Sequence, residues 1–198
     1  MAWQASLFGT ADAVVDPKFA TAVRTPLDPA GESWVDHVPG WVASPDTLFV
    51  SILEGAPWEG HTRWMYDRQV DEPRLRARSW SDAPPVVEEM AMLLSGRYGV
   101  DFSSTGFNLY RNGSDSVAWH GDRVARDLPT AFVAVVSLGG RRRFLLRPKG
   151  GGASRRFDAG SGDLIVMGGA CQRLWEHSVP KTASSGPRIS VTFRHAYE

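Results

Sequence analysis

The sequence has a single cysteine, Cys171, among its 198 residues. An intramolecular disulfide is therefore excluded, as is usual for proteins that fold in a reducing compartment. No apolar run approaches the roughly 20 residues that a membrane-spanning helix needs. Residues 1–16 carry no basic segment ahead of an apolar one, so we expect no signal peptide. From these absences we expect a cytoplasmic protein.

The chain also lacks net charge, since 22 basic residues balance 22 acidic ones. This balance argues against binding a polyanion by bulk charge alone. The charges are unevenly placed, because residues 1–100 hold 8 basic and 14 acidic residues, whereas residues 101–198 hold 14 and 8. The asymmetry indicates either a basic, anion-attracting lobe beside an acidic one or ordinary surface scatter.

The composition is that of a folded protein, with 42% hydrophobic residues and eight tryptophans. Residues 47–53 read as a strand or the start of a short helix. Residues 84–98 predict a helix that begins at proline and ends near Gly96. After residue 100 the sequence changes to short strand-like runs separated by Gly, Asp, Ser and Pro, whereas residues 147–156 read as a hairpin or loop. Such spacing predicts a sandwich or jelly roll.

Chemistry is indicated first by a His-x-Asp pair, His120 and Asp122, at the end of one strand-like run. Residues two apart in a strand share a face, so both side chains can point at one ion. A second histidine, His177, must arrive from a distant strand. Two imidazoles and a carboxylate on one face of an iron form the facial triad of non-heme Fe(II) oxygenases. On spacing alone, a zinc site, a cupin-type site or two structural histidines remain open.

An arginine on a later strand-like run, Arg188, adds a second indication. A forked, permanently charged guanidinium suits the far carboxylate of an anionic cosubstrate that binds the iron through two atoms.

Further blocks give the pattern its specificity. The runs FNLYRNGSDSVAWHGD, SLGG, GDLIVMGGACQRLWEHSVPK and GPRISVTFR follow one another over residues ~100–195. In order and spacing they resemble the AlkB family of Fe(II)/2-oxoglutarate dioxygenases. The family pattern is Asn-x-Tyr, His-x-Asp, a Gly-Asp-rich strand, the distal His and finally Arg-x-Asn-x-Thr-x-Arg.

The resemblance implies roles for individual residues. The iron ligands would be His120, Asp122 and His177. The residues that bind 2-oxoglutarate would be Arg188 and Tyr110 at its distal carboxylate, with Asn108, Ser190 and Arg194 completing the set.

The implied fold is α+β and mainly β, with a double-stranded β-helix (jelly roll) core, N-terminal helices and a substrate lid. We expect a single dioxygenase domain over 1–198, in which 1–99 form an N-terminal extension and lid and 100–198 the catalytic core. The implied cofactors are Fe(II), 2-oxoglutarate and O2. The implied activity is oxidative demethylation of N-alkylated bases in alkylated DNA or RNA, which releases formaldehyde, succinate and CO2.

The candidate lid is residues 60–80, where Trp64 and Tyr66 stand among several arginines. Aromatic rings offer a stacking face to a base and arginines can contact phosphates; the alternative is a core tryptophan beside a solvated face. The substrate-binding candidates are Trp64, Tyr66, Arg68 and, beside an iron ligand, Trp119. The sequence indicates no membrane and no obligate protein partner, and we expect a monomer.

Two positions depart from the family pattern. Val124 stands where many members carry an acid that reads the base edge, and Ser190 stands where the pattern has Asn. The alternative functions are a dioxygenase acting on protein, lipid or a small molecule, and a cupin-like binding module without catalysis. We assign no role to Cys171.

Overall fold

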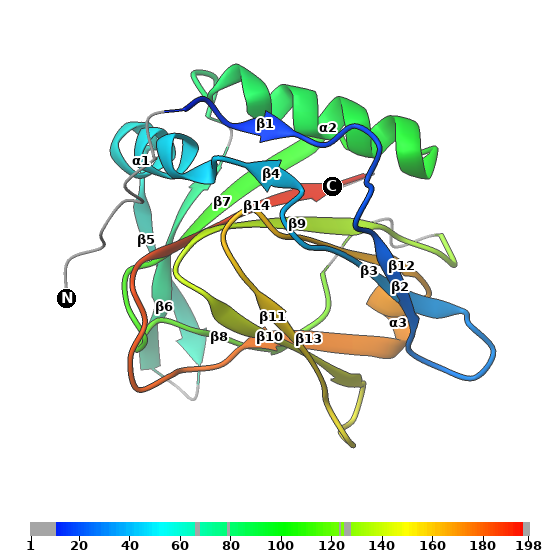
Figure 1. Cartoon of the computed structure of the whole chain (residues 1–198). Coiled ribbons are helices and arrows are strands. Elements are labelled where there is room, and N and C mark those ends of the chain that lie inside the picture. Colours follow the sequence, from blue (N-terminus) through cyan, green and yellow to red (C-terminus); the bar gives the residue numbers. More distant parts are fainter. Residues whose placement is uncertain (1–10, 66–67, 79, 123, 125–127, 196–198) are drawn as a thin grey trace.

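The computed structural model describes residues 11–65, 68–78, 80–122, 124 and 128–195. Two β-sheets lie face to face, and two helices cover the outer face of the larger sheet (Figure 1). This architecture confirms the predicted jelly-roll core with helices packed against it. No helix in the described ranges is both long and apolar enough to cross a bilayer.

The larger sheet is antiparallel and has eight strands in the described part of the chain. Their order is β2 (Val23–Pro26), β3 (Ser33–Val38), β12 (Leu164–Gly169), β9 (Val133–Gly139), β14 (Arg188–Arg194), β7 (Ser104–Tyr110), β6 (Arg68–Arg78) and β5 (Glu59–Met65). The smaller sheet has the order β11 (Arg155–Ala159), β10 (Arg142–Pro148), β13 (Trp175–Val179) and β8 (Val117–His120). A short pair joins β1 (Val14–Val15) to β4 (Val42–Ala43).

Strand β14 shows how the sequence divides the two faces of the larger sheet. Its apolar residues Ile189, Val191 and Phe193 are buried on the helix side. The alternate residues, from Arg188 to Arg194, face the smaller sheet and line a cavity there. The period of two along a strand therefore gives the sheet one apolar face and, near its middle, one polar face.

The two helices complete the core on the outer face. Residues 47–53 lie in α1 (Pro45–Gly55), so the helical alternative is the correct one, and Phe49 and Ile52 are buried against the sheet. The predicted second helix is α2 (Pro85–Tyr98). It continues past Gly96, because the left-handed conformation that ends it is adopted by Gly99, at φ 68°.

Close packing explains the glycine turn at the end of β9. Gly139 has a φ of +81°, and a Cβ atom there would lie 2.6 Å from the carbonyl oxygen of Pro187 and 2.7 Å from the Phe49 ring. Only glycine fits, and α1 can therefore lie directly on the sheet.

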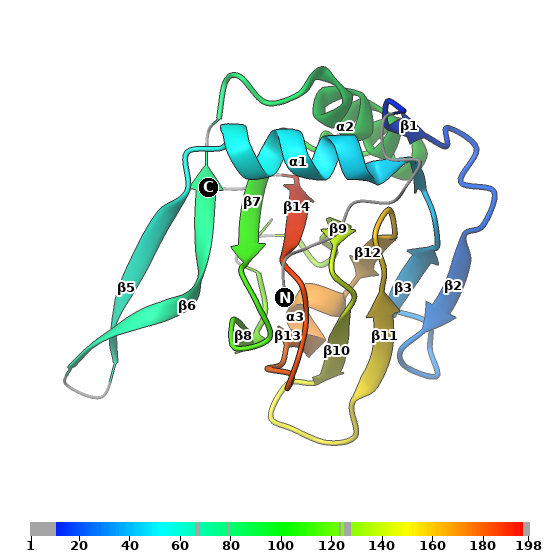
Figure 2. The same cartoon turned by 60° about the vertical axis from the view of Figure 1, so that its left-hand side comes forward.

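Segments on both sides of residue 100 build the larger sheet. Strands β2, β3, β5 and β6 come from 1–99, and two of them pair with strands from 100–198: β3 with β12 and β6 with β7. The lid segment forms the β5–β6 hairpin, which extends the sheet at one edge and projects beyond it (Figure 2). The segment 147–156, expected as a hairpin or loop, connects β10 to β11 in an antiparallel hairpin and includes the start of β11.

Candidate active site

The two histidines meet where β8 pairs with β13. In this register His120 stands directly opposite His177, and their ring centroids are 4.2 Å apart. The ring of Phe144 stacks on His177 from the other side, at 5.3 Å. The ligand atoms of His120, Asp122 and His177 all lie within 4.8 Å of one another. The structure thus brings together the three residues predicted as iron ligands.

Asp122 follows β8 and is held from two directions. Its backbone N–H donates to Oε1 of Gln172 at 2.9 Å, and its Oδ2 accepts from Nε of Arg194 at 2.9 Å. Burial by itself would raise the pKa of Asp122, but the charge of Arg194 and the neighbouring His120 imidazole hold it well below its usual range. The carboxylate is therefore charged and aimed, as a metal ligand must be.

Both imidazoles are prepared to give a lone pair to a metal. Burial and the neighbouring His120 lower the pKa of His177 to about 3, so this ring is neutral at physiological pH. Nδ1 of His120 lies 2.8 Å from the carbonyl oxygen of Ala118. A proton on Nδ1 is donated to that carbonyl, which leaves Nε2 as the ligand atom.

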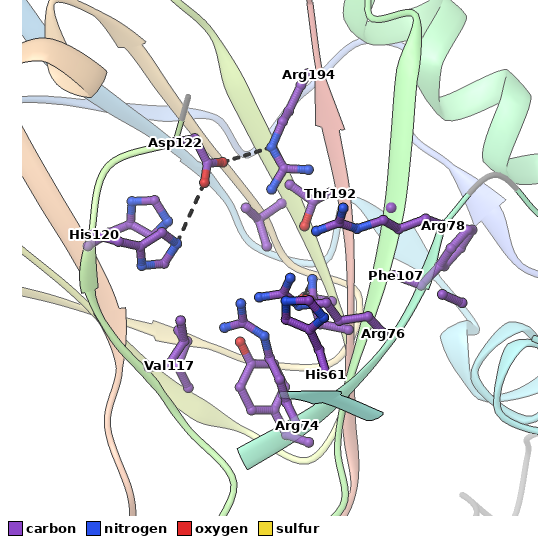
Figure 3. A pocket seen from close by; sticks show the side chains of 18 of the residues that line it. His61, Arg74, Arg76, Arg78, Phe107, Val117, His120, Asp122, Thr192 and Arg194 are labelled. Carbon is purple, nitrogen blue, oxygen red and sulfur yellow. Dashed lines mark hydrogen bonds and ion pairs between the residues drawn. The ribbon is translucent and has the colours of Figure 1, made fainter. Parts of the chain in front are cut away.

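A cavity of about 870 Å³ opens beside these three residues (Figure 3). Its floor is the polar face of β7 and β14, and its outer wall is the lid hairpin. The residues of the floor are Asn108, Tyr110, Arg188, Ser190, Thr192 and Arg194. All five residues predicted to bind 2-oxoglutarate therefore lie in one cavity with the triad.

Arg188 is the most unusual residue of this cavity. It is only 1% exposed, and its Nη2 donates to Oγ of Ser137 at 2.7 Å. Its Nε and Nη1 have no hydrogen-bond partner among the described residues. Burial lowers the pKa of Arg188, but arginine stays charged in proteins. A buried cation that lines a cavity and has two nitrogens without partners fits an anionic ligand, and a carboxylate matches the fork geometry.

Neighbouring groups keep Arg188 and the floor in place. The ring of Tyr110 lies between two guanidinium groups, 5.2 Å from Cζ of Arg188 and 5.6 Å from Cζ of Arg142. Arg142 itself is buried and donates to three backbone carbonyl oxygens. Asn108 on β7 stands opposite Ser190 on β14, and its Nδ2 donates to Oγ of Ser190 at 3.3 Å. The serine therefore still makes a hydrogen bond at the position where the family pattern has Asn.

The lid contributes arginines at alternate positions of β6. Arg74, Arg76 and Arg78 share one face of this strand and reach into the cavity opposite His120 and Asp122 (Figure 3). Leu75 and Ala77 turn to the apolar core on the other side. Sequence reasoning had no means of choosing between these faces, because the choice depends on the pairing of β6 with β7.

Of the four residues predicted to bind substrate, Trp119 is the one whose side chain the structure describes. Tyr66 and the side chains of Trp64 and Arg68 lie outside the described residues. Trp119 is not among the described residues that line the cavity; its ring lies under the guanidinium of Arg147, 4.2 Å from Cζ. Gln172 was not foreseen, since nothing in its local sequence signals contact with a metal-ligand loop 50 residues earlier.

Comparisons with known proteins agree with this geometry. A family model described as the 2OG-Fe(II) oxygenase superfamily matches residues 50–194, and the chain belongs to that superfamily. It is therefore a 2-oxoglutarate-dependent non-heme iron dioxygenase, with Fe(II), 2-oxoglutarate and O2 as cofactor and cosubstrates. Within the superfamily it is a member of the AlkB family, as the following relatives indicate.

Two curated relatives define the extent of the match. The chain is 37% identical over 145 residues to the DNA oxidative demethylase ALKBH2 of Arabidopsis thaliana, an alignment that covers 61% of this chain and 46% of the relative. It is 30% identical over 198 residues to the human alpha-ketoglutarate-dependent dioxygenase alkB homolog 3, covering 86% of this chain and 69% of that protein. The chain thus spans about half the length of the plant relative.

Solved structures support the fold. OsALKBH1 superposes with a TM-score of 0.56 at 16% identity, covering 87% of this chain and all of that one. A 2OG-Fe(II) oxygenase family protein from Burkholderia pseudomallei gives a TM-score of 0.56 at 15% identity, covering 82% and 84%.

Proposed function

We propose that this dioxygenase oxidatively demethylates N-alkylated bases in DNA or RNA. The observation that carries the proposal is the meeting, in one cavity, of the His120–Asp122–His177 triad, the buried Arg188 and a wall of lid arginines. The triad and Arg188 suit the iron and its cosubstrate, and the lid arginines suit a polyanionic substrate. The activity for which the plant relative is named, DNA oxidative demethylation, agrees with this assignment.

The residues of the floor would divide the binding of 2-oxoglutarate between them. Arg188 would pair with the distal carboxylate through its unused Nε and Nη1, and Tyr110 would hydrogen-bond the same carboxylate. Asn108 and Ser190 would line the middle of the molecule. Arg194 would keep Asp122 oriented toward the iron, which is held by two imidazoles and one carboxylate.

The bound iron supplies the oxidising chemistry, in which 2-oxoglutarate is decarboxylated to succinate and one atom of O2 enters a C–H bond of the N-methyl group. The resulting N–CH2OH group would then leave as formaldehyde; the electron pair of the N–C bond would stay on the ring nitrogen, and the hydroxyl proton would pass to that nitrogen in a neutral base or to solvent in a cationic one. The protein's contribution is to hold the methyl group beside the metal and to shield it from water.

The substrate side rests on the lid. A base within a duplex cannot reach a metal at the floor of a cavity, so it must be unpaired or flipped out. Arg74, Arg76 and Arg78 supply positive charge where the flanking phosphates would lie. Trp64, Tyr66 and Arg68, from the sequence segment 60–80, are further proposed substrate contacts, as is Trp119 beside an iron ligand.

The remaining features of the proposal concern the whole chain. We propose one dioxygenase domain over 1–198 that acts as a monomer. We also propose a cytoplasmic location, because nucleic acids and 2-oxoglutarate are both found inside cells.

Turnover with defined substrates tests this function. Fe(II), 2-oxoglutarate and methylated oligonucleotides, single-stranded or duplex and DNA or RNA, should give both formaldehyde and unmethylated base. Replacing the metal ligand in His120→Ala should abolish both, whereas Lys18→Ala on the exposed surface should abolish neither. Succinate release without loss of the methyl group from any oligonucleotide would instead favour a substrate other than nucleic acid.

A further inference from the structure

Strand β10 carries one buried charge on the face that it turns toward the core between the sheets. The residues of that face are Arg142, Phe144 and Leu146, and all three are buried. Phe144 lines the cavity and stacks on His177. Because residues two apart in a strand share a face, Arg142 lies one step along from this part of the cavity wall. It is not among the described residues that line the cavity, so any effect on a bound ligand is exerted from behind the wall.

The guanidinium of Arg142 joins the ends of two strands that carry site residues. Its Nη1 donates to the carbonyl oxygen of Asn112 at 3.2 Å, and its Nη2 donates to those of Asp115 and Pro180 at 2.7 and 2.6 Å. Asn112 and Asp115 lie in the turn that follows Tyr110 at the end of β7, whereas Pro180 directly follows β13. Arg142 therefore ties a strand of the larger sheet to the strand of the smaller sheet that carries an iron ligand.

The turn after Tyr110 is packed closely against the segment after β13. The backbone N–H of Thr182 donates to the carbonyl oxygen of Gly113 at 2.9 Å. A Cβ atom at Gly113 would overlap the carbonyl oxygen of Thr182, so only glycine permits this approach. With Arg142 bonded to both segments, the position of Tyr110 depends on this arginine.

Arg142 has no carboxylate partner of its own in the described part of the chain. Its three hydrogen-bond acceptors are carbonyl oxygens, and the carboxylate of Asp115 is paired with Arg111 at 2.8 Å. Burial lowers the pKa of Arg142, but a guanidinium stays charged in proteins. A methionine would fill similar space without the cost of burying a charge, so packing alone does not account for the residue.

The ring of Tyr110 connects Arg142 to the cosubstrate site. Cζ of Arg142 lies 5.6 Å from the centre of this ring, and Cζ of Arg188 lies 5.2 Å from it. Burial lowers the pKa of Arg188, and the charge of Arg142 lowers it further. Two like charges beside one buried ring raise the free energy of the unliganded protein, and an anion bound there lowers it.

We propose that Arg142 is a positioning residue for 2-oxoglutarate. It fixes Tyr110 through the turn that follows this residue and adds positive charge behind the ring, without touching the cosubstrate. The inference rests on the proposed function, in which Arg188 and Tyr110 bind the distal carboxylate. That carboxylate takes no part in the reaction, so its contacts stabilise the ground state and the transition state equally. Arg142 therefore lowers the KM for 2-oxoglutarate and leaves kcat unchanged.

Three variants test this role through turnover. Arg142→Met should raise the KM for 2-oxoglutarate about tenfold at unchanged kcat, since uniform binding is lost. Arg142→Lys keeps the charge and three N–H donors, and its KM should stay within about threefold of the wild-type value. Arg143→Met changes the exposed neighbour on the other face of β10 and should alter neither quantity.

Binding without turnover gives a second reading. Protein loaded with Co(II) in the absence of O2 is titrated with 2-oxoglutarate, and the dissociation constant should rise about tenfold in Arg142→Met. If Arg142→Met does not fold, Arg142→Gln replaces it, because its amide can still donate to the carbonyl oxygens while the charge is removed. The same rise is expected for this variant.

The outcomes separate positioning from a merely structural role. A folded Arg142→Met with a lowered Tm but wild-type affinity for 2-oxoglutarate would overturn the proposal. An Arg142→Lys variant as weak as Arg142→Met would overturn it as well, because the charge would then contribute nothing.

Arg188→Ala distinguishes failure of this inference from failure of the proposed function. If Arg188→Ala raises the KM for 2-oxoglutarate and Arg142→Met does not, Arg142 alone loses its role. If neither variant raises it, the pocket proposed for the distal carboxylate is itself wrong.

Discussion

At the scale of single residues, Arg188 best shows how function departs from stability. A guanidinium that is 1% exposed, with two N–H groups unpartnered among the described residues, lowers the stability of a protein folded without a ligand. The apolar residues of β14 show no such cost, since Ile189, Val191 and Phe193 fill the core. The unfavourable burial is understandable if a carboxylate completes the site.

Replacing Arg188 should therefore separate stability from cosubstrate binding. Arg188→Met should leave the Tm of the unliganded protein unchanged or raise it by a few degrees, because an unsatisfied buried cation is removed. The apparent KM for 2-oxoglutarate should rise about tenfold or more in Arg188→Met, and we expect the same of Arg188→Ala. In both variants 2-oxoglutarate should no longer raise the Tm. Thermal scans with and without 2-oxoglutarate, together with initial rates, give both readings.

Arg143→Met, an exposed change on β10, is the matched control and should alter neither quantity. An unchanged KM in Arg188→Met would remove Arg188 from its assigned role.

At the scale of elements, the short helix α3 (Cys171–Leu174) fixes the loop that carries Asp122. The side chain of Gln172 accepts the backbone N–H of Asp122, and Arg173 donates to the carbonyl oxygens of Val124 and Leu128. Gly121 permits this approach, because a Cβ atom there would lie 3.3 Å from the carbonyl oxygen of Gln172. The helix therefore positions a metal ligand without being one.

Removing the Gln172 amide should loosen that ligand. Gln172→Ala should weaken metal binding about tenfold, in the range seen when groups that orient metal ligands are lost. Titration with Co(II) or Fe(II) under anaerobic conditions measures this directly and does not depend on turnover. Cys171→Ala, one residue away and also buried, is the control that should keep the wild-type affinity. An unchanged affinity in Gln172→Ala would show that the backbone alone orients Asp122.

The elements also show what the sequence could and could not predict. Strands such as β14 were predictable because buried apolar residues alternate with polar ones, and α2 because its apolar residues recur at helical spacing. Strand β11 was not, since its residues Arg155 and Arg156 are exposed and resemble loop sequence. The strand forms because its backbone pairs with β10, which is a property of tertiary structure.

The functional site likewise has parts that the sequence predicts and parts that it does not. The triad and Arg188 were predictable because each belongs to a spaced motif whose residue types suit iron and a carboxylate. The role of Gln172 and the inward face of Arg74, Arg76 and Arg78 were not, because both depend on which segments pair across the fold.

At the scale of the whole molecule, the fold brings together parts that differ in charge along the sequence. The lid arginines come from the half with 8 basic and 14 acidic residues, and Arg188 and Arg194 from the half with 14 and 8. The larger sheet joins both halves through the pairing of β6 with β7 and of β3 with β12 (Figure 1). The cavity is basic although the chain is neutral, so local arrangement decides what the enzyme can bind.

The central claim, that the cavity couples cosubstrate oxidation to removal of an N-methyl group, can be measured in one reaction. Purified protein with Fe(II), 2-oxoglutarate and an N-methylated single-stranded oligonucleotide should release formaldehyde and succinate in equal amounts above a no-substrate background. Both should disappear when the iron is chelated. Succinate that forms at the same rate with methylated and unmethylated oligonucleotides, without formaldehyde, would contradict the account.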